Sequence, residues 1–122
     1  MTRSIDIGYR HEVSGVETPI ELQPPYYLLG TQSTSKRVWS LPRLREVGIT
    51  RLTELGDGDP VCFVGWEMMG DLWQEIDLLQ RHLGSIDFDP EIKAQWVCHL
   101  LYCYFMLVQT APKGSVPEFS IG

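Results

Sequence analysis

The chain has 122 residues, of which 43% are hydrophobic and 21% charged, a balance that favours one globular domain over residues 1–122 and excludes a disordered chain. The net charge of −6 is uneven: residues 54–91 hold ten acidic side chains and one basic, whereas residues 1–53 hold seven basic and five acidic. The N-terminus has no apolar run leading to a cleavage site, so a cytoplasmic location is expected. Three cysteines are too few for a disulfide framework, and reduced thiols are expected.

The first elements are predicted to be strands. Apolar and polar residues alternate over 5–13 and again over 16–22, which predicts a β-hairpin with a turn at Ser14-Gly15. Pro19 has no amide proton to donate, so the second strand is expected at a sheet edge. A third short strand is predicted at 26–29, before a polar loop over 30–36.

Helices are expected to dominate the rest of the chain. Two short ones are predicted over 40–48 and 50–56, capped by Ser40 and Thr50, and the apolar run 61–64 predicts a buried strand. A helix from Trp66 to Leu83 has an inward stripe of apolar residues at helical spacing: Trp66, Met69, Leu72, Trp73, Ile76, Leu79 and Leu83. Another runs from the cap Asp89 to about Thr110, and a short strand is expected over 119–121.

These elements predict the class of the fold. The expected fold is α+β: an N-terminal β-hairpin within a small antiparallel sheet, two short helices, and a C-terminal antiparallel hairpin of two long helices. The short connection over 84–88 is the reason to expect that the two long helices pack against each other.

The segment Trp96–Val108 contains no Asp, Glu, Lys or Arg. Its thirteen residues fall short of the roughly twenty that cross a bilayer, and His99 with Cys103 supplies only two potential zinc ligands. No membrane span and no metal are therefore expected. We interpret the segment as a core helix in which Cys98 and Cys103 fill space and His99 bonds a buried neighbour. An alternative partner is a second copy of the chain, which would form a homodimer through this helix, residues 96–108.

No cofactor is expected, because the motifs that suggest one are incomplete. The segment 30–37 has the length of a phosphate loop, but Ser35 replaces the second glycine and Arg37 the hydroxyl that would hold magnesium. The acidic pairs at 57–59 and 87–89 do not continue into a calcium loop. No catalytic residue is identified. A ligand-binding or enzyme alternative would use a pocket between hairpin and helices, with the polar groups His11, His99, Tyr102 and Tyr104.

Basic side chains concentrate in residues 36–51, with Glu46 as the only acid among them: Lys36, Arg37, Arg43, Arg45 and Arg51. Overlapping this region, Leu44–Gly56 resembles half of a helix-hairpin-helix unit, whose paired short helices approach a nucleic-acid backbone. The resemblance covers thirteen residues and departs from the pattern at Thr50, where the second hairpin glycine would fall. It implies a nucleic-acid-binding alternative that uses these five cations.

Acidic side chains form a column on the first long helix. Glu67, Asp71 and Glu75 are four residues apart, so like charges stack on one face and destabilise an isolated helix. The helix dipole accounts for acids in the first turn, but not for Glu75. The predicted partner-binding face combines this column with neighbouring acids: Asp57, Asp59, Glu67, Asp71, Glu75 and Asp77.

The leading hypothesis is a small, non-catalytic interaction protein whose acidic face docks a basic protein partner, such as a toxin. Bacterial immunity proteins and antitoxins have a similar size and charge, and this analogy, rather than a family motif, suggests the comparison. Long-range attraction would make such association fast and sensitive to salt.

Overall fold

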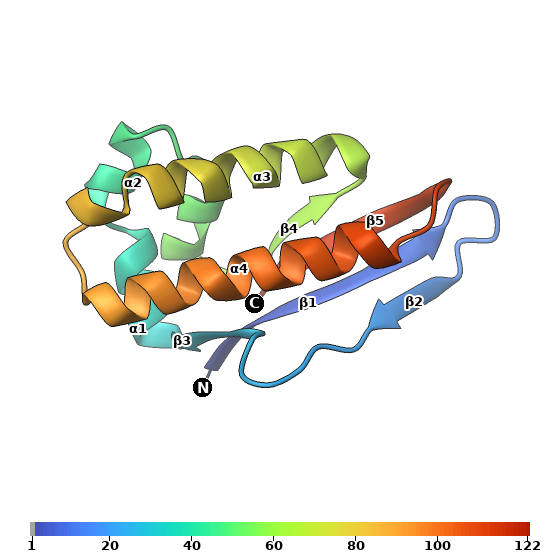
Figure 1. Cartoon of the computed structure of the whole chain (residues 1–122), viewed down its shortest axis with the longest axis horizontal. Coiled ribbons are helices and arrows are strands. Elements are labelled where there is room, and N and C mark those ends of the chain that lie inside the picture. Colours follow the sequence, from blue (N-terminus) through green and yellow to red (C-terminus); the bar gives the residue numbers. More distant parts are fainter. Residues whose placement is uncertain (1) are drawn as a thin grey trace.

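The computed structural model describes residues 2–122, which form an α+β fold with a small antiparallel sheet. Four strands pair in the order β2 (Glu17–Ile20), β1 (Thr2–His11), β5 (Ser115–Ile121) and β4 (Val61–Val64). The fifth strand, β3 (Leu28–Thr31), pairs with the first residues of β1. The last strand of the chain is therefore central in the sheet, and the first is its neighbour (Figure 1).

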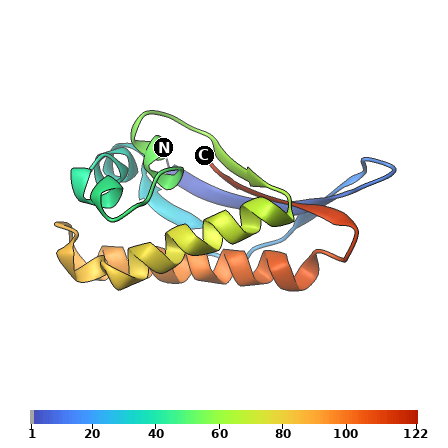
Figure 2. The same ribbon diagram turned by 90° about the horizontal axis from the view of Figure 1, so that it is seen from above.

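Helical segments follow β3, and they are α1 (Gln32–Trp39), α2 (Pro42–Glu46), the 3-10 helix η1 (Leu52–Gly56), α3 (Trp66–Arg81), the 3-10 turn η2 (Leu83–Ser85) and α4 (Pro90–Thr110). Both α3 and α4 lie against the same face of the sheet, and the β1–β2 hairpin projects beyond the end of α4 (Figure 2). Asp89 caps α4 as predicted, because its Oδ1 accepts bonds from the Glu91 and Ile92 amides at 2.9 and 3.0 Å. No helix in residues 2–122 has the length and hydropathy needed to cross a bilayer.

The core lies between the sheet and the helices. Ile7 on β1 is opposite Phe119 on β5, and Phe119 is opposite Phe63 on β4, so these side chains share the inner face of the sheet. All three are buried, and the Phe63 and Phe119 rings meet edge to face at 6.4 Å. Leu72 and Ile76 of α3 and Leu100 of α4 are also buried in this cluster.

Several expectations about the N-terminal half are corrected by the structure. The polar loop expected over 30–36 is wrong: α1 begins at Gln32, because Thr31 Oγ1 accepts a capping bond from the Thr34 amide at 3.2 Å. Ser40 ends α1 rather than capping α2, and Leu41 takes the N-cap position of α2. The hairpin loop spans residues 12–15, since the His11 amide donates to the Val16 carbonyl at 2.9 Å.

The C-terminal half also differs from the expected helical hairpin. α4 is the one long helix, with 21 residues, whereas α3 has 16 and ends at Arg81. The seven-residue strand β5 follows α4, so the chain ends inside the sheet and not in a pair of helices. The predicted strand over 119–121 is therefore longer, because alternate residues of the whole segment 115–121 pack against the core.

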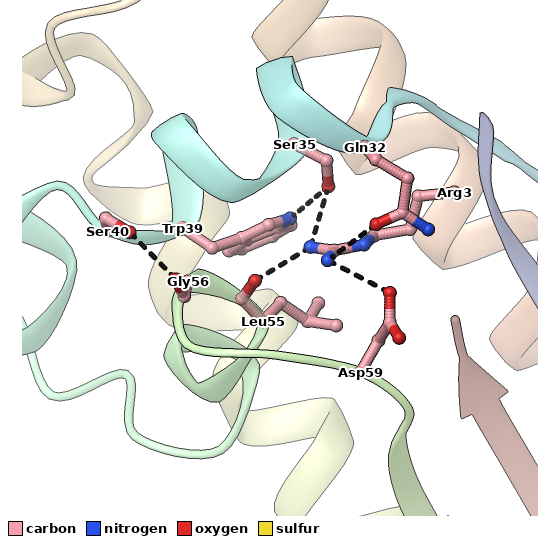
Figure 3. Close-up of polar contacts among 8 residues, drawn as sticks. All are labelled: Arg3, Gln32, Ser35, Trp39, Ser40, Leu55, Gly56 and Asp59. Atoms are coloured by element: carbon pink, nitrogen blue, oxygen red, sulfur yellow. Dashed lines mark hydrogen bonds and ion pairs between the residues drawn. The ribbon is translucent and has the colours of Figure 1, made fainter. Parts of the chain in front are cut away.

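A buried arginine joins the start of the chain to η1 (Figure 3). Arg3 is 1% exposed, and its Nη1 donates to the Leu55 carbonyl at 2.8 Å and to Ser35 Oγ at 3.3 Å. Its Nη2 donates to Gln32 Oε1 at 3.1 Å and forms an ion pair with Asp59 at 3.2 Å. One side chain thus connects β1, α1, the end of η1 and the segment before β4.

We expect Arg3→Met to lower the free energy of unfolding by about 2–4 kcal/mol, because the Leu55 carbonyl and Asp59 would lose a charged donor in a buried setting. Urea unfolding followed by circular dichroism measures this change. The matched control is Arg10→Met on the same strand, which removes a surface ion pair to Glu118 of 3.7 Å and should cost about 1 kcal/mol or less. Equal losses of unfolding free energy in both variants would show that the Arg3 contacts stabilise the fold no more than a surface ion pair does.

Candidate interaction surface

The acidic column predicted on α3 does not form one exposed face. Glu75 is 6% exposed and points toward η1, where its Oε1 accepts a bond from the Leu52 amide at 2.9 Å. Its Oε2 accepts bonds from the Arg51 amide at 3.1 Å and from Thr50 Oγ1 at 3.3 Å. The expectation that Glu75 faces solvent is wrong, because this carboxylate satisfies the free amides at the start of η1.

The other predicted acids are exposed to different degrees and have different neighbours. Asp59 pairs with Arg3, Asp57 pairs with Arg45 at 3.6 Å, and Asp77 pairs with Arg81 at 3.0 Å. Glu67 and Asp71 are exposed, one turn apart on α3. Of the predicted acidic column, Glu67 and Asp71 are therefore the two members that face solvent. Asp77 lies further along the same helix.

Two tryptophans assigned to the core stripe of α3 are instead on its outer surface. Trp66 is 44% exposed, and its Nε1 donates to the Ser115 carbonyl at 2.9 Å, which fixes the indole ring at the start of the helix. Trp73 is 38% exposed and packs against Tyr104 and Phe105 of α4, with ring centroids 5.4 and 5.7 Å away. Both rings are held in place while much of their surface remains open to solvent.

Gly70 lies between the two tryptophans on the same side of α3. Residues four and seven apart share a helical face, so Trp66, Gly70 and Trp73 form one row along the helix. A Cβ added at Gly70 would meet nothing within 4 Å. The row is therefore two indoles separated by a gap that has no side chain, and we call these three residues the α3 notch. Glu67 and Asp71 directly follow Trp66 and Gly70 in sequence, and each lies about 100° further around the helix.

The basic residues of segment 36–51 do not gather into one free patch. Arg51 donates through Nη2 to the Cys62 carbonyl and lies over the Phe63 ring, 5.2 Å from its centroid. Arg45 bonds Thr53 Oγ1 at 3.3 Å, and Arg43 bonds Ser85 Oγ at 3.1 Å. Lys36 and Arg37 are exposed at the end of α1. Four of the five cations thus have contacts within the protein, since Arg37 also lies over the Phe88 ring.

The polar groups considered for a pocket lie in three separate places. The His99 ring is buried, as predicted, and its Nδ1 bonds the Leu28 carbonyl at 2.7 Å. Tyr102 stacks on Tyr26 beside it, with ring centroids 4.7 Å apart. Tyr104 packs on Trp73, and His11 Nδ1 accepts from the Ser14 amide in the hairpin loop at 3.1 Å. Within residues 2–122, no cluster of three or more His, Cys, Asp or Glu side chains is arranged to hold a metal.

The edge strands β2 and β4 are both blunted. At β2 and the residue before it, positions 16, 18 and 20 bond to β1, so Pro19 points its main-chain nitrogen outward, where a pairing strand would need a donor. In β4 the carbonyl of Cys62 accepts from Arg51, and the Val64 amide donates to Met68 Sδ at 3.4 Å. Strand addition at β2 or β4 is therefore disfavoured, and the helical layer is the more suitable face for an interaction.

Comparisons with known proteins give no relative for this chain: no family model matches it, and no curated protein or solved structure matches it significantly.

The role of Glu75 can be tested by removing its charge alone. We expect Glu75→Gln to lower the free energy of unfolding by about 1–3 kcal/mol, because three donors at the start of η1 lose their charged acceptor. Glu67→Gln, on the exposed side of the same helix, should change stability by about 0.5 kcal/mol or less. Chemical denaturation of the two variants compares them directly, and a neutral Glu75→Gln would contradict the assigned role.

The three thiols should differ in reactivity. Burial raises the pKa of Cys103 from 9.0 to about 12, and its Sγ lies 3.2 Å from the Tyr26 carbonyl. Because the folded pKa lies above the unfolded one, Cys103 contributes stability below pH 9 that is lost as the pH rises toward 12. With a thiol reagent at pH 8 in dilute solution, where single chains predominate, we expect Cys98 and Cys62 to react without denaturant and Cys103 only after unfolding. Peptide mapping identifies the labelled residue, and native labelling of Cys103 would contradict this assignment.

Proposed function

We propose that this chain is a small, non-catalytic interaction protein that binds a basic protein partner through the α3 notch and the carboxylates of Glu67 and Asp71. The proposal keeps the basic partner expected from the charge distribution, and it replaces the column through Glu75 with the exposed surface of α3. A toxin neutralised by an immunity-like protein is one partner of this chemistry.

Gly70 is the observation that carries the proposal. Glycine in the middle of a helix is less stable than alanine by about 1 kcal/mol. Nothing lies within 4 Å of a Cβ placed at Gly70, so no close neighbour requires a glycine. The fold therefore has no packing requirement for glycine here. A gap between two fixed indoles, in contrast, requires a residue without a side chain.

The chemistry of the notch favours a cationic group. Indole faces attract guanidinium and ammonium groups, and the attraction is stronger where water is partly excluded. The backbone positions of Trp66 and Trp73 are about 10 Å apart along the helix axis, which is more than the thickness of one planar side chain. Glu67 and Asp71 add two carboxylates that complement the positive charge.

This chain uses the same contact internally. Arg37 lies over the Phe88 ring at 5.8 Å, and Arg51 lies over Phe63 at 5.2 Å. Arginine is also the residue that pairs best with a carboxylate while stacking on an aromatic ring. We therefore commit to arginine as the anchor that the partner inserts.

Titration with nona-arginine, followed by tryptophan fluorescence at low ionic strength, tests the surface with a defined probe. We expect binding that weakens as salt is added, because exposed charges are screened over about 10 Å at 0.1 M. Glu67→Lys/Asp71→Lys should raise the Kd roughly tenfold or more. The control Glu12→Lys/Glu21→Lys changes two exposed hairpin acids by the same charge and should leave the Kd within about threefold. Equal weakening in both would mean that only the net charge matters, which would defeat the proposal.

Gly70→Ala separates function from folding in one substitution. We expect it to raise the free energy of unfolding by about 0.5–1 kcal/mol, because alanine restricts the unfolded chain and favours the helix. The same change should weaken nona-arginine binding, because a methyl group enters the gap between the indoles. Thermal unfolding and the fluorescence titration report the two effects. A variant that is more stable and binds equally well would show that the gap has no role.

A further inference from the structure

The outer side of α4 has a second feature that the basic partner does not use. Five residues spaced by four, three, four and three positions run along the helix away from the core: Ala94, Cys98, Leu101, Phe105 and Val108. Ala94, Cys98 and Phe105 are exposed, and Leu101 and Val108 are half-buried. This is the spacing of a coiled-coil seam, and it lies on the side opposite the residues that pack on the sheet. We call these five residues the α4 seam.

The seam is also free of charge. From Ala94 to Thr110 the helix has no Asp, Glu, Lys or Arg, although the chain as a whole carries a net charge of −6. A solvated helix face normally carries charged side chains, so an uncharged apolar face indicates a covering partner. Two copies of an acidic protein repel each other, and contact between uncharged faces minimises that repulsion.

We propose that the α4 seam packs against the α4 seam of a second copy, antiparallel, with a two-fold axis near Leu101. In this antiparallel arrangement, the sizes of the seam's side chains are complementary to those of the second copy. Leu101 then meets Leu101 of the partner subunit, Ala94 is opposite the partner's Val108, and Cys98 is opposite the partner's Phe105. Each small side chain faces a larger one, as close packing requires.

A parallel arrangement fits the same residues poorly. It would place the two Phe105 rings together and the two Ala94 methyl groups together, leaving one end crowded and the other loose. It would also align the two helix dipoles, which antiparallel packing opposes. A two-fold contact is closed, so the assembly stops at two copies.

The dimer leaves the carboxylates of the proposed partner site accessible. Trp73 leans toward α4 in the contact with Tyr104 and Phe105, whereas Asp71 lies about 160° around the helix from Trp73. The dimer does not depend on the proposed function, and the two are tested by different substitutions.

Sedimentation velocity on the full chain tests the assembly. At tens of micromolar, we expect the wild-type protein to sediment as a dimer, a species with twice the 14.0 kDa mass of one chain. Cys98→Glu adds a carboxylate at an exposed seam position, and it should raise the dissociation constant roughly tenfold or more. The matched control is Gln95→Glu, an exposed position one turn earlier and outside the seam, which should stay dimeric. A wild-type monomer at these concentrations, or a dimeric Cys98→Glu variant, would overturn the proposal.

Cross-linking tests the orientation. In the antiparallel dimer the two Cys98 positions are about 9 Å apart along the helix axis, beyond the roughly 7 Å between Cα atoms that a disulfide spans. Mild oxidation should therefore leave the wild type uncross-linked. Leu101→Cys combined with Cys98→Ser should form an interchain disulfide at the two-fold axis. Cross-linking of the wild type through Cys98 would show a parallel dimer, in which each residue meets its own copy, and would contradict this geometry. If Cys98→Glu leaves the Kd for nona-arginine unchanged, the dimer and the partner-binding surface are independent of each other.

Discussion

The anchoring of η1 by two buried charges is the constraint on which the rest of this structure depends. Glu75 reaches from α3 to the amides at the start of this 3-10 helix, and Arg3 reaches from β1 to a carbonyl at its end. A five-residue 3-10 helix has little stability of its own, so these contacts hold it in place. They also tie the first strand, α1 and α3 together, and Asp59 completes the arginine's partners before β4 begins. An uncompensated charge at either end would be costly, which makes this arrangement specific as well as stabilising.

With η1 anchored, the edges of the sheet and the outer sides of the helices differ in how accessible they are to a partner. Arg51, which directly precedes η1, covers the edge of β4, and Pro19 blocks the opposite edge at β2. The helices cover the inner face of the sheet and present their own outer sides to solvent (Figure 2). On α3 that outer side carries two fixed indoles and a glycine gap, and on α4 it carries an uncharged seam. Interaction through the helical layer follows from these placements, with a cationic anchor proposed for α3 and a second copy for α4.

The candidate site shows how far helical spacing can be interpreted. The periodicity of α3 correctly identified Met69, Leu72, Ile76 and Leu79 as inward residues. It also assigned Trp66 and Trp73 to the core and Glu75 to solvent, and both assignments were wrong. Spacing defines a stripe, but its edges depend on which neighbours cover the helix. Here α4 leaves Trp73 partly open, and the free amides of η1 accommodate a carboxylate. Besides the acids Glu67 and Asp71, the glycine at position 70, a poor helix former, is a signal in the sequence that could have pointed to this outer surface.

The sequence by itself determined the local elements whose causes are local. Alternation specified the hairpin, the missing amide of Pro19 assigned β2 to an edge, and Asp89 with Pro90 marked where α4 begins. Tertiary structure decided what depends on distant neighbours. Helix α1 replaced an expected loop because Val38 and Trp39 have a core to pack against. Strand β5 lies in the centre of the sheet because it pairs with β1 on one side and with β4 on the other. Burial of Glu75 required amide groups more than twenty residues away, and no spacing along one helix can reveal them.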